Sequence, residues 1–67
     1  MQATQADVSW DTRTKQWLVR VHIGEEVIRR HLKSPRDADE QTLRTLAVQT
    51  AQEEGYQLDP SRVNIGA

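Results

Sequence analysis

The fold is decided by residues 16–33, which read QWLVRVHIGEEVIRRHLK. Residues 16–23 carry apolar side chains at their odd positions, which is typical of a strand with one buried face. Gly24 and Glu25 fit a two-residue type II′ turn, because glycine at the first position supplies the positive φ that this turn requires. Residues 26–33 then run back as a second strand. The sequence therefore predicts a β-hairpin.

The turn sets which residues of the two strands lie opposite each other, and a shift by one residue would move every side chain to the other face. We expect Ile23 opposite Glu26 and Arg20 opposite Arg29. One face of the hairpin is then apolar, with Arg30 at its border, where its stem covers apolar surface. This face comprises Trp17, Val19, Val21, Ile23, Ile28 and Leu32.

A helix is expected at residues 35–54, covering the apolar face of the hairpin. Ser34 suits the N-cap, Pro35 the first helical position, and Asp37 can reach back as in a capping box. Gly55 suits the residue that ends the helix in the left-handed conformation. The helix presents one narrow apolar stripe. Its members are Leu43, Leu46, Ala47 and Ala51.

Two short strands complete the predicted sheet. Residues 7–10 form the first, with Val8 and Trp10 on one side, and residues 11–15 form a polar turn. Residues 62–65 form the last strand, parallel to the strand before the helix, at a sheet edge that the sequence does not identify. The predicted fold class is α+β: a small β-β-β-α-β domain, mainly antiparallel sheet with one helix packed on one face.

The length of 67 residues allows one domain of marginal stability, because so short a chain buries only about 60% of its unfolded surface. Residues 1–6 are rich in glutamine, alanine and threonine, and we expect them to form a disordered N-terminal tail. Residues 7–66 are then the single α+β domain.

Several classes of function are disfavoured by composition. The absence of cysteine excludes disulfides and thiolate metal sites and fits a reducing, cytoplasmic location. No apolar run reaches the roughly 18 residues of a membrane span, and the N-terminus lacks a secretory signal. No catalytic triad or glycine-rich phosphate loop is present. His22 and His31 lie roughly 13 Å apart along the predicted sheet, too far to share zinc. We expect no enzyme activity, cofactor, metal or membrane partner.

The face opposite the apolar one is basic, although the net charge of the chain is only −1. Leu18 and Val27 are the apolar residues on it, and two cations in the preceding turn extend it. Its candidate partner-binding residues are Arg13, Lys15, Arg20, His22, Arg29, His31 and Lys33. A solvent-exposed sheet face must be polar in any case, so plain solvation is the alternative interpretation.

The leading hypothesis is a small non-catalytic protein-binding module, a regulator or adaptor. It would dock an acidic surface of another protein on the basic face, or add a partner strand at a free sheet edge. The alternative is a nucleic-acid-binding domain that uses the same basic face. The chain is expected to be a monomer or a weak homodimer that associates through an edge strand.

Residues 15–21 (KQWLVRV), Gly24, residues 29–30 (RR) and residues 34–38 (SPRDA) resemble the arm-type DNA-binding domains of tyrosine recombinases. Those domains bind DNA with a three-stranded sheet that precedes a helix, so the resemblance implies the nucleic-acid alternative. The extra last strand and the acidic isoelectric point depart from that family. The β-β-α-β portion is also similar in outline to small phage inhibitors of bacterial RNA polymerase and to HicB-like antitoxins.

Overall fold

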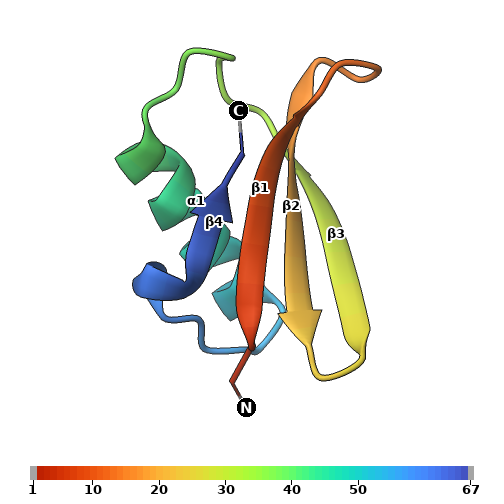
Figure 1. Cartoon of the computed structure of the whole chain (residues 1–67), viewed down its shortest axis with the longest axis vertical. Coiled ribbons are helices and arrows are strands. Elements are labelled where there is room, and N and C mark those ends of the chain that lie inside the picture. The colour runs from red at the N-terminus through yellow and green to blue at the C-terminus, as the bar shows by residue number, and fades with distance from the viewer. Residues whose placement is uncertain (1, 67) are drawn as a thin grey trace.

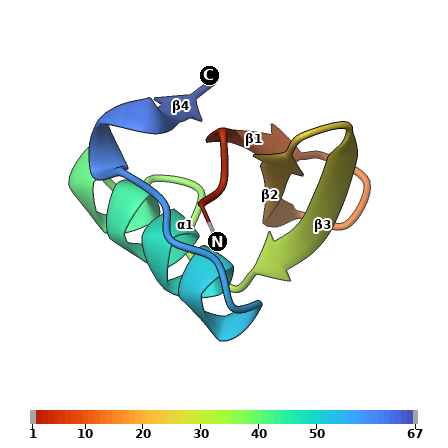
Figure 2. The same cartoon turned by 90° about the horizontal axis from the view of Figure 1, so that it is seen from below.

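The structure, a computed structural model, describes residues 2–66. A four-stranded sheet has the order β3-β2-β1-β4, in which β4 runs parallel to β1 and the other neighbours are antiparallel. One helix lies across one face of this sheet (Figures 1 and 2), which confirms the predicted α+β class. The elements are β1 (Gln5–Asp11), β2 (Gln16–Ile23), β3 (Glu26–Leu32), α1 (Glu40–Glu53), the 3-10 turn η1 (Pro60–Arg62) and β4 (Val63–Ile65).

The β2–β3 hairpin has the predicted register. Ile23 lies opposite Glu26 and Arg20 lies opposite Arg29. Gly24 has a φ of +59°, the positive value that the first position of a type II′ turn requires. Trp17 therefore points to the side of the sheet that α1 covers and is 6% exposed. We call this side the inner face and the opposite side the outer face.

The last strand, β4, occupies the edge beside β1. Ala6 lies next to Val63, and Val8 lies next to Ile65. Because β1 and β3 both run antiparallel to β2, β4 is also parallel to β3, as predicted. The choice of edge, which the sequence leaves open, places β3 at the opposite edge of the sheet.

The prediction of a disordered tail at residues 1–6 is wrong for residues 2–6. Met1 lies outside the described residues. β1 begins at Gln5, and the backbone N–H of Ala3 donates to the carbonyl of Gln57 at 2.8 Å. Ala6 is 0% exposed. This segment is ordered because its backbone pairs with neighbouring segments, which does not depend on large apolar side chains.

The predicted start of the helix is also wrong, because α1 begins at Glu40 and Ser34 is not its N-cap. Residues 35–38 instead form a turn, closed by a hydrogen bond from the last backbone N–H to the first carbonyl at 3.0 Å. The N-cap is Asp39, whose carboxylate accepts a hydrogen bond from the backbone N–H of Thr42 at 2.8 Å. The predicted end of the helix is close to the observed one, since Gly55 follows with a φ of +88°.

Stability should fall in acid, because the pKa of Asp39 is held below the ordinary value of 3.8 by hydrogen bonds from the Thr42 hydroxyl and amide. The pKa values of Asp11 and Asp59 are also lowered, chiefly by the backbone N–H two residues later. A carboxyl group whose pKa is lower in the folded chain than in the unfolded chain stabilises the fold at any pH above its unfolded-state pKa. This stabilisation is lost as the pH falls through the folded-state pKa.

We therefore expect the melting temperature to decline below about pH 4. In Asp39→Asn, the amide oxygen still caps the helix but no longer titrates. The decline should be shallower in this variant when both proteins are melted across the same pH series. Equal slopes would show that the Asp39 cap does not contribute to acid unfolding.

Candidate binding surface

The predicted basic residues belong to the outer face and to the end of the sheet where β3 stops. The outer face of β2 and β3 carries Arg20, His22, Arg29 and His31. Lys33 is exposed just after β3, and Arg13 and Lys15 are exposed in the β1–β2 loop at the same end of the sheet. The structure thus brings the β2 and β3 members together. Arg13 and Lys15 lie at one end of the sheet and not on the outer face itself.

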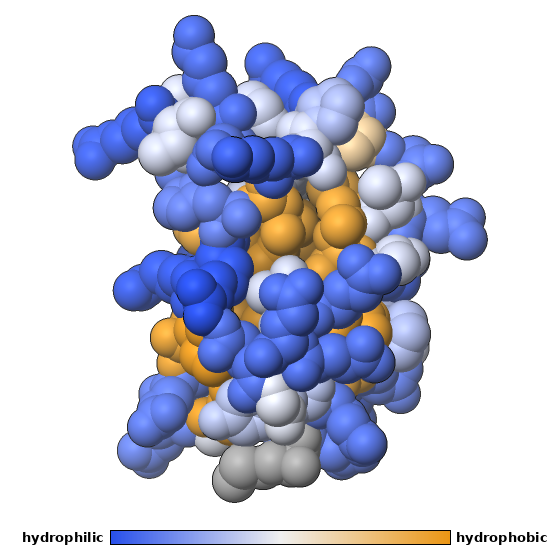
Figure 3. All heavy atoms as spheres, turned by 180° about the vertical axis from the view of Figure 1, so that it is seen from behind, coloured by the Kyte–Doolittle hydropathy of each residue, from blue (hydrophilic) through white to orange (hydrophobic). Residues whose placement is uncertain are grey.

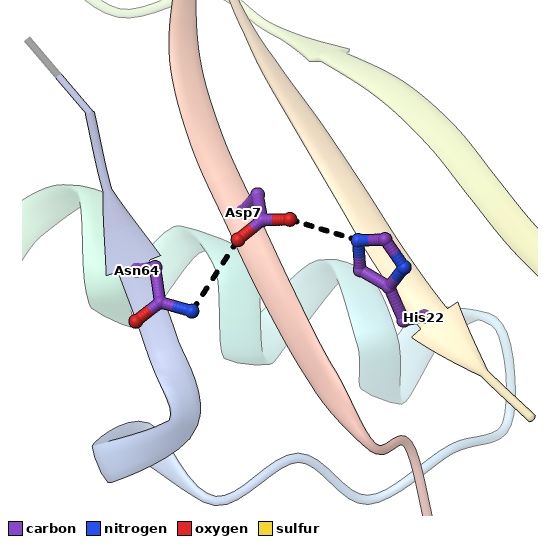
Figure 4. Close-up of polar contacts among 3 residues, drawn as sticks. All are labelled: Asp7, His22 and Asn64. Atoms are coloured by element: carbon purple, nitrogen blue, oxygen red, sulfur yellow. Dashed lines mark hydrogen bonds and ion pairs between the residues drawn. The ribbon is translucent and has the colours of Figure 1, made fainter.

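Sequence reasoning missed two acidic residues on the same outer face. β1 places Asp7 opposite Arg20, and it places Asp11 opposite Gln16. His22 Nε2 lies 2.8 Å from a carboxylate oxygen of Asp7, whose second oxygen accepts a hydrogen bond from Asn64 Nδ2 at 3.3 Å (Figure 4). These two contacts therefore link β2, β1 and β4 through the carboxylate of Asp7.

A second histidine contact lies toward the other end of β1. His31 Nε2 is 3.4 Å from Asp11 Oδ2, while Asp11 Oδ1 accepts the backbone N–H of Arg13 at 3.0 Å. This is an Asx-type bond, which is common at the start of a loop. The Arg13 amide, with a smaller contribution from His31, holds the pKa of Asp11 below 3.8, so Asp11 is an anion at neutral pH.

These contacts show that the outer face is not uniformly basic. Two carboxylates on β1 contact both histidines. Among residues 2–66, the cations of the outer face that have no ion pair lie on β2, on β3 and just after β3. The alternation of residues 5–11 was the signal that could have shown this, because a strand with Val8 inward must point Asp7 outward. The predicted strand at residues 7–10 already indicated this for Asp7, whereas Asp11 lay in the predicted turn.

Three cations beside the β1 carboxylates have no ion pair among residues 2–66: Arg20, Arg29 and Lys33, which we call the basic strip. Arg29 and Lys33 are exposed, whereas Arg20 is partly buried. The Nε atom of Arg20 is buried and has no hydrogen-bond partner in the described part of the chain. Buried donors of this kind are normally satisfied, but this one is closed to solvent. The exposed side chains of Arg29 and Lys33 are the members of the strip that offer hydrogen-bond donors to an anionic group.

The other notable surface is a groove of about 500 Å3 between β3 and α1. Figure 3 views the molecule from the helix side and shows apolar surface surrounded by hydrophilic side chains. Leu32 and Leu46 line the groove, and an ion pair between Arg30 and Glu54 lies across it. Arg30 therefore lies at the border of the inner face, as predicted.

No protein-family model, curated protein or solved structure matches this chain. Within residues 2–66, no helix is long and apolar enough to cross a membrane. The same residues contain no group of three histidine, aspartate or glutamate side chains placed to hold a metal ion.

Proposed function

We propose that this protein is a small non-catalytic protein-binding module, a regulator or adaptor, that docks an acidic segment of another protein on the basic strip. The observation that supports this most directly is the opposition of Arg20 and Arg29, neither of which has an ion pair within residues 2–66. Like charges directly opposite each other in a sheet are destabilising by up to about 1 kcal/mol. A carboxylate bound between the two guanidinium groups would relieve that repulsion and accept bidentate hydrogen bonds.

An acidic protein segment fits the outer face better than a nucleic-acid duplex does. The anionic Asp11 and its neighbour along β1, Asp7, share this face with the basic strip. A phosphate backbone laid across the sheet would meet both carboxylates, whereas an extended peptide following β2 and β3 would pass Asp7 only beside Arg20 and would avoid Asp11. Nucleic acid, whose binding would use the same arginines, is the alternative that the experiment must separate.

The test is a double charge reversal, Arg29→Glu with Lys33→Glu. Arg20 is left unchanged, because a glutamate there would lie directly opposite Asp7. The probe is a short peptide of alternating glutamate and alanine, titrated into the labelled protein and followed by NMR. We expect the amide signals of β2 and β3 to shift when the peptide binds. Binding to the double variant should be weakened about tenfold or more, because the attraction between these exposed cations and the acidic peptide is lost.

The matched control makes the same change of net charge elsewhere, through Arg36→Glu with Arg62→Glu, both at exposed positions outside the strip. This control should bind the peptide as the wild type does. Equal weakening in both variants would reduce the effect to net charge and contradict the proposed site. The function would be nucleic-acid binding if a DNA duplex gave the shifts, with steep salt dependence, and the peptide gave none.

A further inference from the structure

The edge of the sheet formed by β3 is open along its length. β3 has seven residues, and no segment among residues 2–66 pairs with the edge of β3 that faces away from β2. The strand at the opposite edge of the sheet, β4, has three residues. In a two-residue hairpin the residues that flank the turn form a hydrogen-bonded pair, and such pairs alternate along the ladder. Val27, Arg29 and His31 therefore direct their backbone N–H and C=O groups to the open edge, where they form a template for another strand.

The charges along β3 are self-complementary for antiparallel pairing. The strand begins after Glu25 with Glu26, and its second half contains Arg29 and Arg30. An antiparallel copy of the same strand brings the acidic start of each chain next to the basic half of the other. From this pattern we infer that β3 pairs with β3 of a second copy of this chain, about a two-fold axis at Ile28.

In this register Glu26 lies opposite Arg30 of the second copy on the inner face, and Ile28 lies opposite Ile28. Val27 lies opposite Arg29 on the outer face, so the backbone groups that both residues direct to the open edge meet each other. Val27 is 40% exposed and Ile28 is partly buried in the single chain. Pairing removes apolar surface of both residues from water, which is favourable for so small a domain.

Other registers are disfavoured by like charges or by the turn. An axis at Arg29 or at Arg30 would oppose that arginine to its own copy, which is destabilising. An axis at Val27 runs into the turn and places Gly24 opposite Arg30. A charge on the inner face of an edge strand normally prevents pairing, and Arg30, with 55% of its side chain exposed, is such a charge. The register centred on Ile28 gives it a carboxylate on the same face.

The two-fold axis of such a pair is perpendicular to the sheet, so the two four-stranded sheets become continuous and both helices lie on one side. The outer faces then join, and the basic strips of the two copies lie next to each other across the new strand pair. The inference does not depend on the proposed function. If both hold, the dimer presents the acidic partner with two adjacent strips.

Sedimentation equilibrium of the full chain tests the pairing and its register. We expect a reversible dimer, weakened about tenfold or more by Glu26→Arg or by Arg30→Glu, because each change creates two like-charge pairs per dimer. The combined variant should recover most of the wild-type affinity. Glu54→Gln is the control, because it removes the ion-pair partner of Arg30 within one chain and leaves the β3 edge unchanged.

Amide hydrogen exchange on the wild-type protein gives a second readout that needs no substitution. Protection of the Val27 and Arg29 amides should increase with protein concentration, whereas the amide of Ile28, which already faces β2, should not respond. Two results would overturn the inference: a monomer at all concentrations up to millimolar, or a combined variant that dimerises no better than the single ones.

Discussion

Replacing Ala6 by aspartate is expected to unfold this protein. Ala6 is 0% exposed in the middle of the core, with Val63 beside it in β4 and Val21 opposite it in β2. An unpaired carboxylate there costs several kcal/mol, through desolvation or through the shift in pKa that keeps it neutral. The whole stability of a chain of this length is about 3–10 kcal/mol. Far-UV circular dichroism and urea denaturation would show a mostly unfolded chain.

The matched control is Gln5→Asp, one residue earlier. Gln5 lies on the outer face opposite His22 and is only partly buried, so its replacement should change the free energy of unfolding by less than about 0.5 kcal/mol. In a strand with one buried face, the same substitution at two adjacent positions must differ in its stability cost in this way. If Ala6→Asp and Gln5→Asp were equally harmless, residues 2–6 would be a tail and β1 would not begin at Gln5.

The first six residues show where the sequence is uninformative. Alanine carries little hydrophobic signal, yet Ala3 and Ala6 are buried. They are buried because α1 presents Ala47 and Ala51, both 0% exposed, and a helix with small residues can lie close to the sheet. Whether a small residue is buried thus depends on a partner some forty residues away, and no local pattern reports it.

The hairpin was predictable because its determinants are local. Gly24 selects the turn, the turn selects the register, and the alternation of residues 16–23 selects the buried face. The opposition of Arg20 and Arg29 followed directly from that register. The direction of β4 also followed, because a helix that crosses back over a sheet constrains it, but the edge it joins did not.

The candidate site was predictable only on the hairpin. Arg20 and Arg29 were placed correctly, and Lys33 follows the end of β3. The carboxylates of Asp7 and Asp11 come from β1, and their effect depends on how β1 aligns with β2. A four-residue loop connects these two strands, and a loop of that length sets register less firmly than the turn at Gly24. The pairing of His22 with Asp7 therefore became visible only in the structure.

The late start of α1 has a tertiary cause that leads to the second large prediction. Trp17 is 6% exposed, and its Nε1–H donates to the carbonyl of Pro35 at 2.8 Å. The same carbonyl closes the turn by accepting the N–H of Ala38. Trp10 stacks edge-on against Trp17 with ring centroids 5.4 Å apart, and Arg36 lies over the Trp10 ring. The two indoles thus fix the turn that occupies the expected first part of the helix.

Trp17→Ala should therefore lower the free energy of unfolding by about 3–5 kcal/mol, enough to leave this small domain largely unfolded. Trp17→Phe keeps most of the ring in the core and removes the donor, so its cost should be nearer 1–2 kcal/mol. Trp10→Ala, at a partly buried position, is the matched control and should cost less than Trp17→Ala. Urea denaturation of the three variants ranks these effects.

Local amide exchange in the phenylalanine variant tests the hydrogen bond to Pro35. If that bond fixes the turn, amide exchange at Ala38 should accelerate in Trp17→Phe, while the amides in the middle of α1 keep their protection, because the Asp39 cap remains. Equal acceleration throughout α1 would mean that the whole helix loosens and that the turn has no separate anchor. Equal stability of Trp17→Ala and Trp17→Phe would contradict the burial of the indole itself, since alanine leaves a much larger cavity than phenylalanine does.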